Sequence, residues 1–411
     1  MTTPGLDVEP ACPAEVLSEA KQPPTAQRAP DLVALRRPFE SIEPSVWDRL
    51  AQASPWATPF SRWAFHRAWW DAYGSNAHDQ TLVIVDHARA HDANAPVVAI
   101  APLMHRHAHE PGDAETATKM RHTDGAPLTA VPEAAKAVFF GASYHADYAT
   151  LLASAADLPG VAEAVVRELS EPSSDPDHPL PWDVIDLRRL RCGDPVADEL
   201  AAAFGRREVS CGWTLNVERE DVCPVVRLPR GGTFDDYLAT LGKKERHEVR
   251  RKIRRADAAG DVRLVDADDP MIELETFIEL HQKRWGADGL FPDGHAGVAS
   301  RTFFRRLFEL SGRDGPVRLS LLTVGERKVA AGVSFDDGER IYFYNAGIDP
   351  AAGELSPGVV MSAMYIRRAI ELGRSSLDFL RGDESYKYEW GAVDEPIQRI
   401  LVRRTQAGQD R

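Results

Sequence analysis

Hydrophobic and polar positions follow two different periods along this chain. From residue 31 onward, segments with apolar residues every three or four positions are followed by short runs rich in Val, Ile and Phe, such as 96–103 (PVVAIAPL) and 328–335 (KVAAGVSF). The first period is typical of amphipathic helices and the second of strands. The pattern therefore predicts the α/β fold class rather than a helical bundle or a β-sandwich.

The two halves of the chain repeat one order of predicted elements, which favours an internal duplication. Each half has a strand pair, an aromatic strand, a helix that begins at Pro-Gly and a final strand. The segments are 81–85 with 96–103, 138–144, 158–169 and 184–194 in the first half, and 318–324 with 328–335, 341–347, 356–372 and 376–384 in the second. This alignment makes Asp186 the counterpart of Asp378. A chance match of common patterns is the alternative.

The repeat predicts a division into two modules, 31–225 and 226–411. Residues 1–30 contain six prolines and few large apolar residues, so we expect a disordered tail there. Each module also has a Trp-containing helical region. The tryptophans are Trp63, Trp69, Trp70 and Trp285, and their helical spacing predicts core anchors.

Composition narrows the function classes. The 411 residues are 43% hydrophobic and carry a net charge of −14, which suits a globular protein and argues against a basic nucleic-acid coat protein. Residues 1–225 hold 19 basic and 33 acidic residues, whereas 226–411 hold 30 of each, so the second half is the better place for an anionic ligand. No run approaches the ~18 apolar residues of a membrane span, and no signal core is visible. We expect a cytoplasmic protein without membrane insertion.

Residues that could bind metal do not form a recognisable site in the sequence. The four cysteines, Cys12, Cys192, Cys211 and Cys223, include no Cys-x-x-Cys pair. His105, His107 and His109 alternate, but metal sites take ligands from more than one element, so a polar loop is favoured and no metal is expected. Nucleophile-elbow and Walker motifs are absent from the sequence, which argues against serine hydrolases and P-loop NTPases.

A strongly basic segment in the second half has no counterpart in the first. Residues 243–255 (KKERHEVRRKIRR) hold eight basic and two acidic residues. On a helix, one face would carry Lys243, His247, Arg250, Arg251 and Arg254. Such a face suits phosphates, and an ordinary solvated surface is the alternative.

Segment 353–359 (GELSPGV) predicts a helix start that could bind an anion. The first N–H groups of a helix have no acceptor within the helix, and the helix dipole favours negative charge there. Ser356 is expected to cap the helix and Pro357 fits its first turn. A well-built helix start without a ligand is the alternative.

Segment 378–391 (DFLRGDESYKYEWG) follows a short strand and is dense in chemically useful side chains. It supplies carboxylates, cations and aromatics, listed as Asp378, Asp383, Glu384, Arg381, Lys387, Tyr386, Tyr388 and Trp390. Acyl transfer to an amine needs a proton acceptor and a positive group near the developing oxyanion. This segment contains both proton acceptors and positive groups. The alternative is a loop whose charged side chains form salt bridges with one another.

Six segments of the second half carry a family resemblance. They read KKERHEVRRKIRRADAAG, FIELHQKRWG, KVAAGVSFDDG, YFYNAGIDP, LSPGV and DFLRGDESYKYEWG, within about 226–403. In this order they resemble the GNAT-superfamily branch that groups Fem-type aminoacyl transferases with the BioF-like acetyltransferase domain of CelD-like, polysaccharide-associated proteins. TPFSRWAFHRAWWDAYG and VAIAPL resemble the degenerate N-terminal repeat of the same proteins.

The resemblance implies two tandem GNAT-like modules, each a mixed, mainly antiparallel sheet flanked by helices, with the basic helical segment added to the second. It implies that the donor pyrophosphate lies on segment 353–359, and Gly353, Ser356, Gly358 and Val359 are the expected contacts. Tyr386-Lys387 matches the aromatic-Lys pair of Fem-type enzymes. The usual Gln/Arg-x-x-Gly-x-Gly/Ala coenzyme A loop is absent, which leaves acetyl-CoA less secure than acyl transfer.

These observations predict an N-acyltransferase that uses acetyl-CoA or another acyl-CoA and modifies an amine of a sugar, polysaccharide or cell-envelope precursor. Lys387 is expected to stabilise the oxyanion, and Glu384 or Asp383 to orient or deprotonate the amine. The expected substrate-binding residues are Arg381, Tyr386, Asp378, Arg250 and Arg254. The alternatives are a Fem-type transferase that uses aminoacyl-tRNA, and a binding protein that has lost catalysis.

Overall fold

The computed structural model of the chain describes residues 31–106, 128–129, 131, 135–170 and 182–404. The predicted tail, residues 1–30, lies outside these ranges, as do Cys12, His107 and His109. No helix within the described ranges has the length and apolar character needed to cross a membrane.

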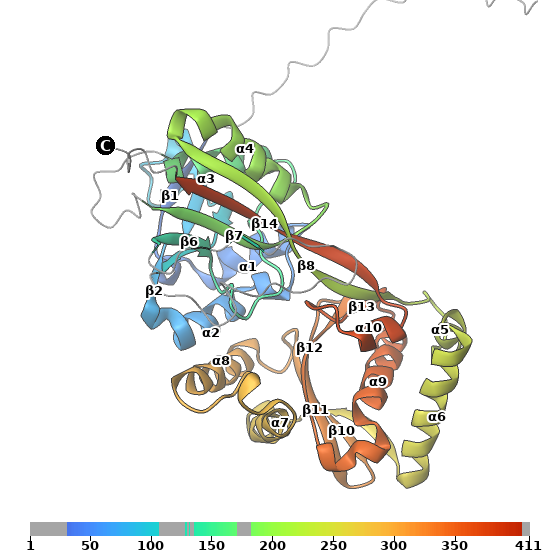
Figure 1. The fold of residues 1–411 in the computed structure, drawn as a ribbon. Coiled ribbons are helices and arrows are strands. Elements are labelled where there is room, and N and C mark those ends of the chain that lie inside the picture. The colour runs from blue at the N-terminus through green and yellow to red at the C-terminus, as the bar shows by residue number, and fades with distance from the viewer. Residues whose placement is uncertain (1–30, 107–127, 130, 132–134, 171–181, 405–411) are drawn as a thin grey trace, which may run out of the picture. The chain divides into compact units, whose positions relative to one another are not determined.

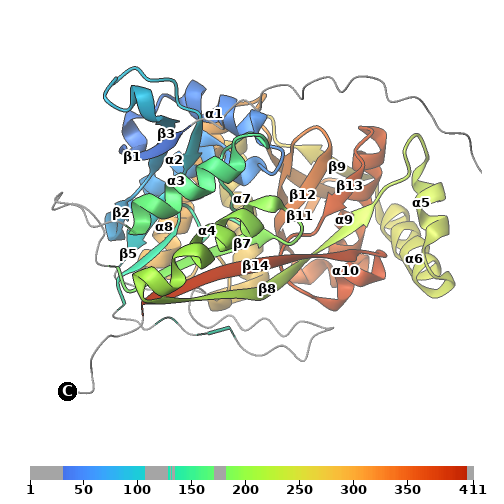
Figure 2. The ribbon, with the colours of Figure 1, turned by 90° about the horizontal axis from the view of Figure 1, so that it is seen from above.

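Eleven strands of the described chain form one mixed sheet, shown edge to edge in Figures 1 and 2. In spatial order they are β2 (Ala77–Asp79), β5 (Leu103–Arg106), β6 (Ala137–Phe140), β7 (Val184–Arg191), β14 (Val393–Arg404), β8 (Trp213–Arg227), β13 (Ser376–Asp378), β12 (Arg340–Ile348), β11 (Arg327–Asp336), β10 (Val317–Val324) and β9 (Val262–Asp266). Among the strands of the described ranges, β6 with β7 and β12 with β13 are the parallel pairs. The predicted mixed, mainly antiparallel sheet with flanking helices is confirmed.

The parallel pairs place Asp186 and Asp378 at equivalent positions. In the first half Phe139 of β6 lies opposite Asp186 of β7, and in the second half Tyr342 of β12 lies opposite Asp378 of β13. Each aspartate is the last residue of its parallel register. This equivalence matches the alignment drawn from the sequence repeat and supports the duplication.

The halves share the centre of this sheet, because each supplies a strand to the other. The last strand of the described chain, β14, pairs with β7 of the first half, and β8 pairs with β13 of the second half. Between them, β14 and β8 pair along twelve positions (Figure 2). The module boundary predicted after residue 225 falls within β8, two residues before its end.

A smaller three-stranded sheet belongs to the first half. It is formed by β1 (Leu32–Arg36), β3 (Leu82–Asp86) and β4 (Ala99–Ala101). The strand pair expected at 81–85 and 96–103 is present, since Val83 lies opposite Ile100. In the second half the expected hairpin is β10 with β11, turning at Gly325 with φ of 60°.

Ten α-helices of the described chain lie against the sheets, and those predicted at 158–169, 243–255 and 356–372 are among them. They are α1 (Pro44–Ala53), α2 (Trp63–Tyr73), α3 (Leu158–Ser170), α4 (Pro195–Cys211), α5 (Phe234–Thr240), α6 (Lys243–Ala259), α7 (Pro270–Trp285), α8 (His295–Ser311), α9 (Pro357–Glu371) and α10 (Ser385–Glu389). The basic segment is α6, which is followed by Gly260 and lies along α9 (Figure 1). Both Pro-Gly helix starts are present, in α3 and α9.

The two halves also pack through α2 and α8. The rings of Phe65 and Phe303 meet edge to face at 5.3 Å, and the Tyr73 hydroxyl lies 2.9 Å from Ser300 Oγ. Trp69 is fully buried in the core that spans both halves, as predicted for a core anchor. This packing holds the loop after β6 against the second half.

The sheet opens on one side of β12. The parallel pairing with β13 covers only Arg340–Tyr342, whereas β12 continues to Ile348. Tyr344 is an extra residue in the register between β12 and β11, where Val333 faces Asn345 and Ser334 faces Phe343. Such a bulge increases the local twist and bend of a strand. The result is a split between β12 and the chain that follows β13.

Candidate active site

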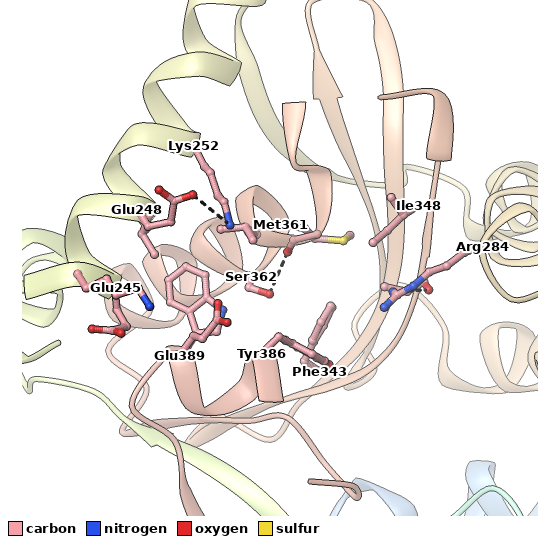
Figure 3. Close-up of a pocket in the computed structure, with 16 residues that line it drawn as sticks. Glu245, Glu248, Lys252, Arg284, Phe343, Ile348, Met361, Ser362, Tyr386 and Glu389 are labelled. Atoms are coloured by element: carbon pink, nitrogen blue, oxygen red, sulfur yellow. Dashed lines mark hydrogen bonds and ion pairs between the residues drawn. The ribbon is translucent and has the colours of Figure 1, made fainter. Parts of the chain in front are cut away.

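A cavity of about 390 Å³ lies between α6, the start of α9 and the end of β12 (Figure 3). Its walls include Val249, Phe343, Ile348, Met361 and Trp390, and Gly358 and Val359 line it at the start of α9. Charged side chains lie around this apolar lining, namely Lys244, Glu245, Glu248, Lys252, Arg284 and Glu389. Figure 3 shows Arg284 across the cavity from the α6 side chains. An apolar cavity with a helix N-terminus in its wall suits a ligand with an apolar arm and an anionic group.

The start of α9 is built differently from the sequence expectation. Ser356 occupies the N-cap position, but its side chain does not cap the helix, so that prediction is wrong. Its backbone is left-handed, with φ of 53°, and its Oγ accepts a hydrogen bond of 2.6 Å from Arg255 of α6. Pro357 begins the helix as predicted. The basic helix therefore contacts the predicted anion-binding segment directly.

A second cavity of about 400 Å³ adjoins the first and is more polar. The two share Arg284, Phe343, Ala346 and Tyr386. The second cavity also has Glu384, Arg381 and Lys387 in its wall, and its first-half residues are Tyr144, His145 and Asp147. Both modules therefore build this cavity, and it meets the first one in the split beside β12.

His145 ties the first-half loop to β12. Its Nδ1 lies 3.0 Å from the Tyr344 hydroxyl, which donates to the His145 carbonyl at 2.9 Å, and its Nε2 lies 2.8 Å from the Tyr73 hydroxyl. The ring stacks on Phe303 at 4.1 Å. Burial lowers the pKa of His145 to about 3, so the imidazole is neutral near pH 7. It contributes hydrogen bonds rather than charge to the second cavity.

Lys387 points into the turn that follows β13. Its Nζ donates to the carbonyl oxygens of Leu380, Arg381 and Gly382 at 2.9–3.0 Å, and Glu384 Oε2 lies 2.8 Å away. Leu380 and Gly382 have positive φ, 58° and 109°. An ammonium has three N–H donors, so the three carbonyls already engage them all. In this arrangement Lys387 holds the turn at the edge of the second cavity.

Residues 243–388 match the family model described as the acetyltransferase (GNAT) domain. Residues 243–388 are therefore a GNAT-type domain. The matched range contains the start of α9, the split beside β12 and the turn held by Lys387. The resemblance to GNAT acyltransferases predicted from the six segments is therefore confirmed.

Solved structures with the same fold are distant in sequence. FemX is 11% identical, covers 87% of this chain and 96% of its own, and has a TM-score of 0.55. A conserved protein of unknown function from Bacteroides thetaiotaomicron is 13% identical, covers 89% of this chain and 98% of its own, and has a TM-score of 0.50. At such identities the likeness shows the fold alone. A search of curated proteins finds no match.

Within the GNAT domain, the predicted site residues fall into two groups. Those that line the cavities are Gly358, Val359, Arg381, Glu384, Tyr386 and Lys387. Gly353, Ser356, Asp378, Asp383, Arg250 and Arg254 line neither of the two. Asp378 is fully buried, where it accepts from the Tyr148 hydroxyl at 2.8 Å and pairs with Arg340 at 3.0 Å. Arg250 pairs with Asp235 on the surface at 2.9 Å.

The cavity residues that the sequence analysis missed include Tyr144, His145, Asp147 and Arg284. The first three follow β6, the aromatic strand of the first half, which corresponds to β12 of the GNAT domain. The internal repeat was therefore the one sequence feature that could have pointed to these three residues. Trp285 was predicted to be a core anchor, and this is wrong. It is 43% exposed at the end of α7 and lines the second cavity.

No three His, Cys, Asp or Glu side chains in the described ranges converge as metal ligands. His105 lies on β5, in the first half and outside the GNAT domain.

Proposed function

We propose that this protein is an N-acyltransferase whose acyl donor binds in the first cavity and whose amine acceptor binds in the second. The observation that carries the proposal is that the two cavities meet at Arg284, Phe343, Ala346 and Tyr386, in the split beside β12 of the GNAT domain. A transfer enzyme must bring two substrates into contact, and adjoining sites avoid the entropic cost of a bimolecular encounter.

For the donor, we propose acetyl-CoA or another acyl-CoA. The apolar walls formed by Val249, Ile348 and Met361 suit an extended thioester arm. Gly358 has no side chain to keep a phosphate from the backbone of the first turn of α9, and helix N-termini favour anions. Val359 lines the cavity beside Gly358. Ser356 and Gly353 lie outside its lining, so we propose that they contribute to the phosphate contact through the shape of the helix start. These residues fit a phosphate-bearing donor.

For the acceptor, we propose an amine of a sugar, polysaccharide or cell-envelope precursor. Amines are mostly protonated at pH 7, so Glu384, in the wall of the second cavity, can attract the ammonium and take its proton. The neutral amine nitrogen then attacks the thioester carbonyl carbon. The N–C bond forms and the C–S bond breaks. The nitrogen loses a second proton as it becomes an amide, and this proton converts the departing thiolate to the free thiol. A positive charge near the carbonyl oxygen would stabilise the oxyanion. We assign this role to Lys387 through its charge, because the turn after β13 already engages its N–H donors.

A Fem-type donor, aminoacyl-tRNA, is the second candidate. The specific observation in its favour is that the basic helix α6 forms a wall of the first cavity, with Lys244 and Lys252 among the lining residues. A net charge of −14 opposes a long polyanion, so acyl-CoA remains our first choice. A binding protein without catalysis is the remaining alternative.

Thermal shift measurements with acetyl-CoA, CoA and aminoacyl-tRNA test the donor. Thiol release from acetyl-CoA, with a panel of amino sugars as acceptors, then tests the reaction. We expect stabilisation by acetyl-CoA and amine-dependent thiol release. Stabilisation by aminoacyl-tRNA alone would favour the hypothesis of a Fem-type transferase. Ligand binding without turnover of any acceptor would favour the hypothesis of a non-catalytic binding protein.

A further inference from the structure

We propose that the acceptor carries an acidic group besides its amine, and that Arg284 binds this group. The inference deepens the proposed function, because it names a chemical class for the amine in the second cavity. The acidic group is a carboxylate or a phosphate, both of which match the planar guanidinium fork.

Among the described residues, Arg284 has no carboxylate within ion-pair distance, and Glu384 of the same wall acts on it only from farther away. Five charged side chains line this cavity, since His145 is neutral. Four of them form two pairs: Arg381 Nε lies 3.4 Å from Asp147 Oδ1, and Lys387 Nζ lies 2.8 Å from Glu384 Oε2. Arg284 is the fifth, and it makes no ion pair within the described ranges. The cavity therefore has one positive charge in excess.

Arg284 also has hydrogen-bond donors to spare. Its Nη1 donates to the Ala346 carbonyl at the long distance of 3.4 Å, which is its one hydrogen bond to the described residues. Its guanidinium lies over the Trp285 ring, 4.5 Å from the centroid. Figure 3 shows the guanidinium end of Arg284 directed into the cavity space. The side chain is thus supported by an aromatic ring, while most of its N–H groups have no protein acceptor in the described chain.

A solvated arginine stacked on an exposed tryptophan is the simpler explanation of this contact. It does not account for the position of Arg284 in the wall of both cavities. Because the junction is where the acyl group and the amine would meet, a cation there acts on a substrate group close to the reacting atoms.

The donor is the less suitable partner for Arg284. Apart from the shared Arg284, the first cavity is lined by two cations, Lys244 and Lys252, and by three carboxylates, Glu245, Glu248 and Glu389, so it has no positive excess of its own. The proposed phosphate contact of the donor is at the start of α9. The positive excess belongs to the acceptor cavity, where Glu384 can attract the amine end and Arg284 the acidic end of one molecule.

Equilibrium binding without donor tests this inference independently of acyl transfer. The probes are two matched pairs of amines: glucosamine 6-phosphate with glucosamine, and 4-aminobutanoate with 4-aminobutanamide. Each is titrated calorimetrically into the full chain, its Arg284→Gln variant and the control Lys283→Gln. Lys283 is the neighbouring residue, pairs with Glu279 at 2.8 Å and lines neither of the two cavities, so it matches the charge change.

We expect the wild-type protein to bind an acidic member about ten- to a hundredfold more tightly than its neutral partner, the range for a hydrogen-bonded charge. Arg284→Gln should abolish this preference, Arg284→Lys should restore part of it, and Lys283→Gln should retain it. The pair that shows the preference identifies phosphate or carboxylate. Equal binding of both members, a preference that survives Arg284→Gln in a folded variant, or no binding of either acidic probe at millimolar concentration would each overturn the inference. A missing donor or missing turnover would count against the proposed function and leave this result unaffected.

Discussion

The Nζ atom of Lys387 lies 2.8 Å from Oε2 of Glu384, and the same nitrogen donates to three consecutive carbonyl groups. One residue that we selected for positive charge and another that we selected for proton transfer are thus paired with each other. The pair joins the turn after β13 to the wall of the second cavity.

Replacing Lys387 with Ala should lower turnover by ~10²–10³, the scale for loss of one oxyanion donor. Lys387 is also buried, so the substitution should lower stability as well. The carbonyls of Leu380, Arg381 and Gly382 lose their common donor, and we expect a loss of about 1–3 kcal/mol in unfolding free energy. Steady-state kinetics and urea unfolding measure the two effects. Unchanged turnover in a folded variant would remove Lys387 from the catalytic residues.

The two neighbouring carboxylates should respond differently to neutralisation. Glu384 lines the second cavity, whereas Asp383 lines neither of the two, although the sequence did not distinguish them. Glu384→Gln should lower kcat/KM for the amine by about 10²–10⁴, as for loss of a general base. Asp383→Asn is the matched control and should stay near wild type. Comparable losses in both variants would argue for a general charge effect.

Gly358 and Gly160 offer a matched test of the donor site. A Cβ atom at Gly358 would lie 3.0 Å from Ile348 Cδ1, and one at Gly160 would lie 3.2 Å from Leu32 Cδ1, so the two positions are similarly tight. Gly358→Val should weaken donor binding because its side chain blocks the first turn of α9. Gly160→Val should leave donor binding intact. Retained acetyl-CoA affinity in folded Gly358→Val, measured by calorimetry, would place the anion site elsewhere.

The basic helix separates the two possible donors. Each phosphate neutralised on binding adds to the slope of log affinity against log salt, and a tRNA offers many phosphates. Reversing the charges of Lys243, Arg250, Arg251 and Arg254 should abolish binding of a tRNA that uses this face. The same change should affect acetyl-CoA affinity only modestly. If the salt dependence of aminoacyl-tRNA binding to the wild-type protein corresponds to several neutralised phosphates, our preference for acyl-CoA is overturned.

Buried histidines should make the protein sensitive to mild acid. Burial lowers the pKa of His66 to about 3, compared with 6.5 in an unfolded chain, so between these values only the unfolded state takes up the proton. Stability should therefore fall as pH decreases below 6.5, by about 1.4 kcal/mol per pH unit for each such proton. The His66→Leu variant lacks this imidazole, so its unfolded state takes up one proton fewer. Urea unfolding from pH 7 to 4.5 should show a shallower slope in the variant, and an identical slope would contradict the assignment.

Much of the fold was accessible from local patterns. The positions of α3, α9 and the β10–β11 hairpin depend on turn residues and on a periodicity that each segment carries itself. The equivalence of Asp186 and Asp378 also emerged from sequence, because duplicated elements keep their order. The cap at Ser356 was wrong because Arg255, a hundred residues away along the chain, binds the hydroxyl instead.

The sequence by itself determined the α/β class, the repeated order of elements, the basic helix and the segment from Asp378 to Lys387. Only the tertiary structure decided which residues meet. It exchanged β8 and β14 between the halves and brought Asp147 of the first half to Arg381 of the second. It also placed Arg284 at the junction of two cavities, with no ion pair to any described residue. The spacing of apolar residues indicates which face of a helix or strand is buried. This spacing can be seen within each segment alone. Strand pairing and cavity walls depend on contacts between segments far apart in the sequence. The local pattern of one sequence does not show which of these segments meet.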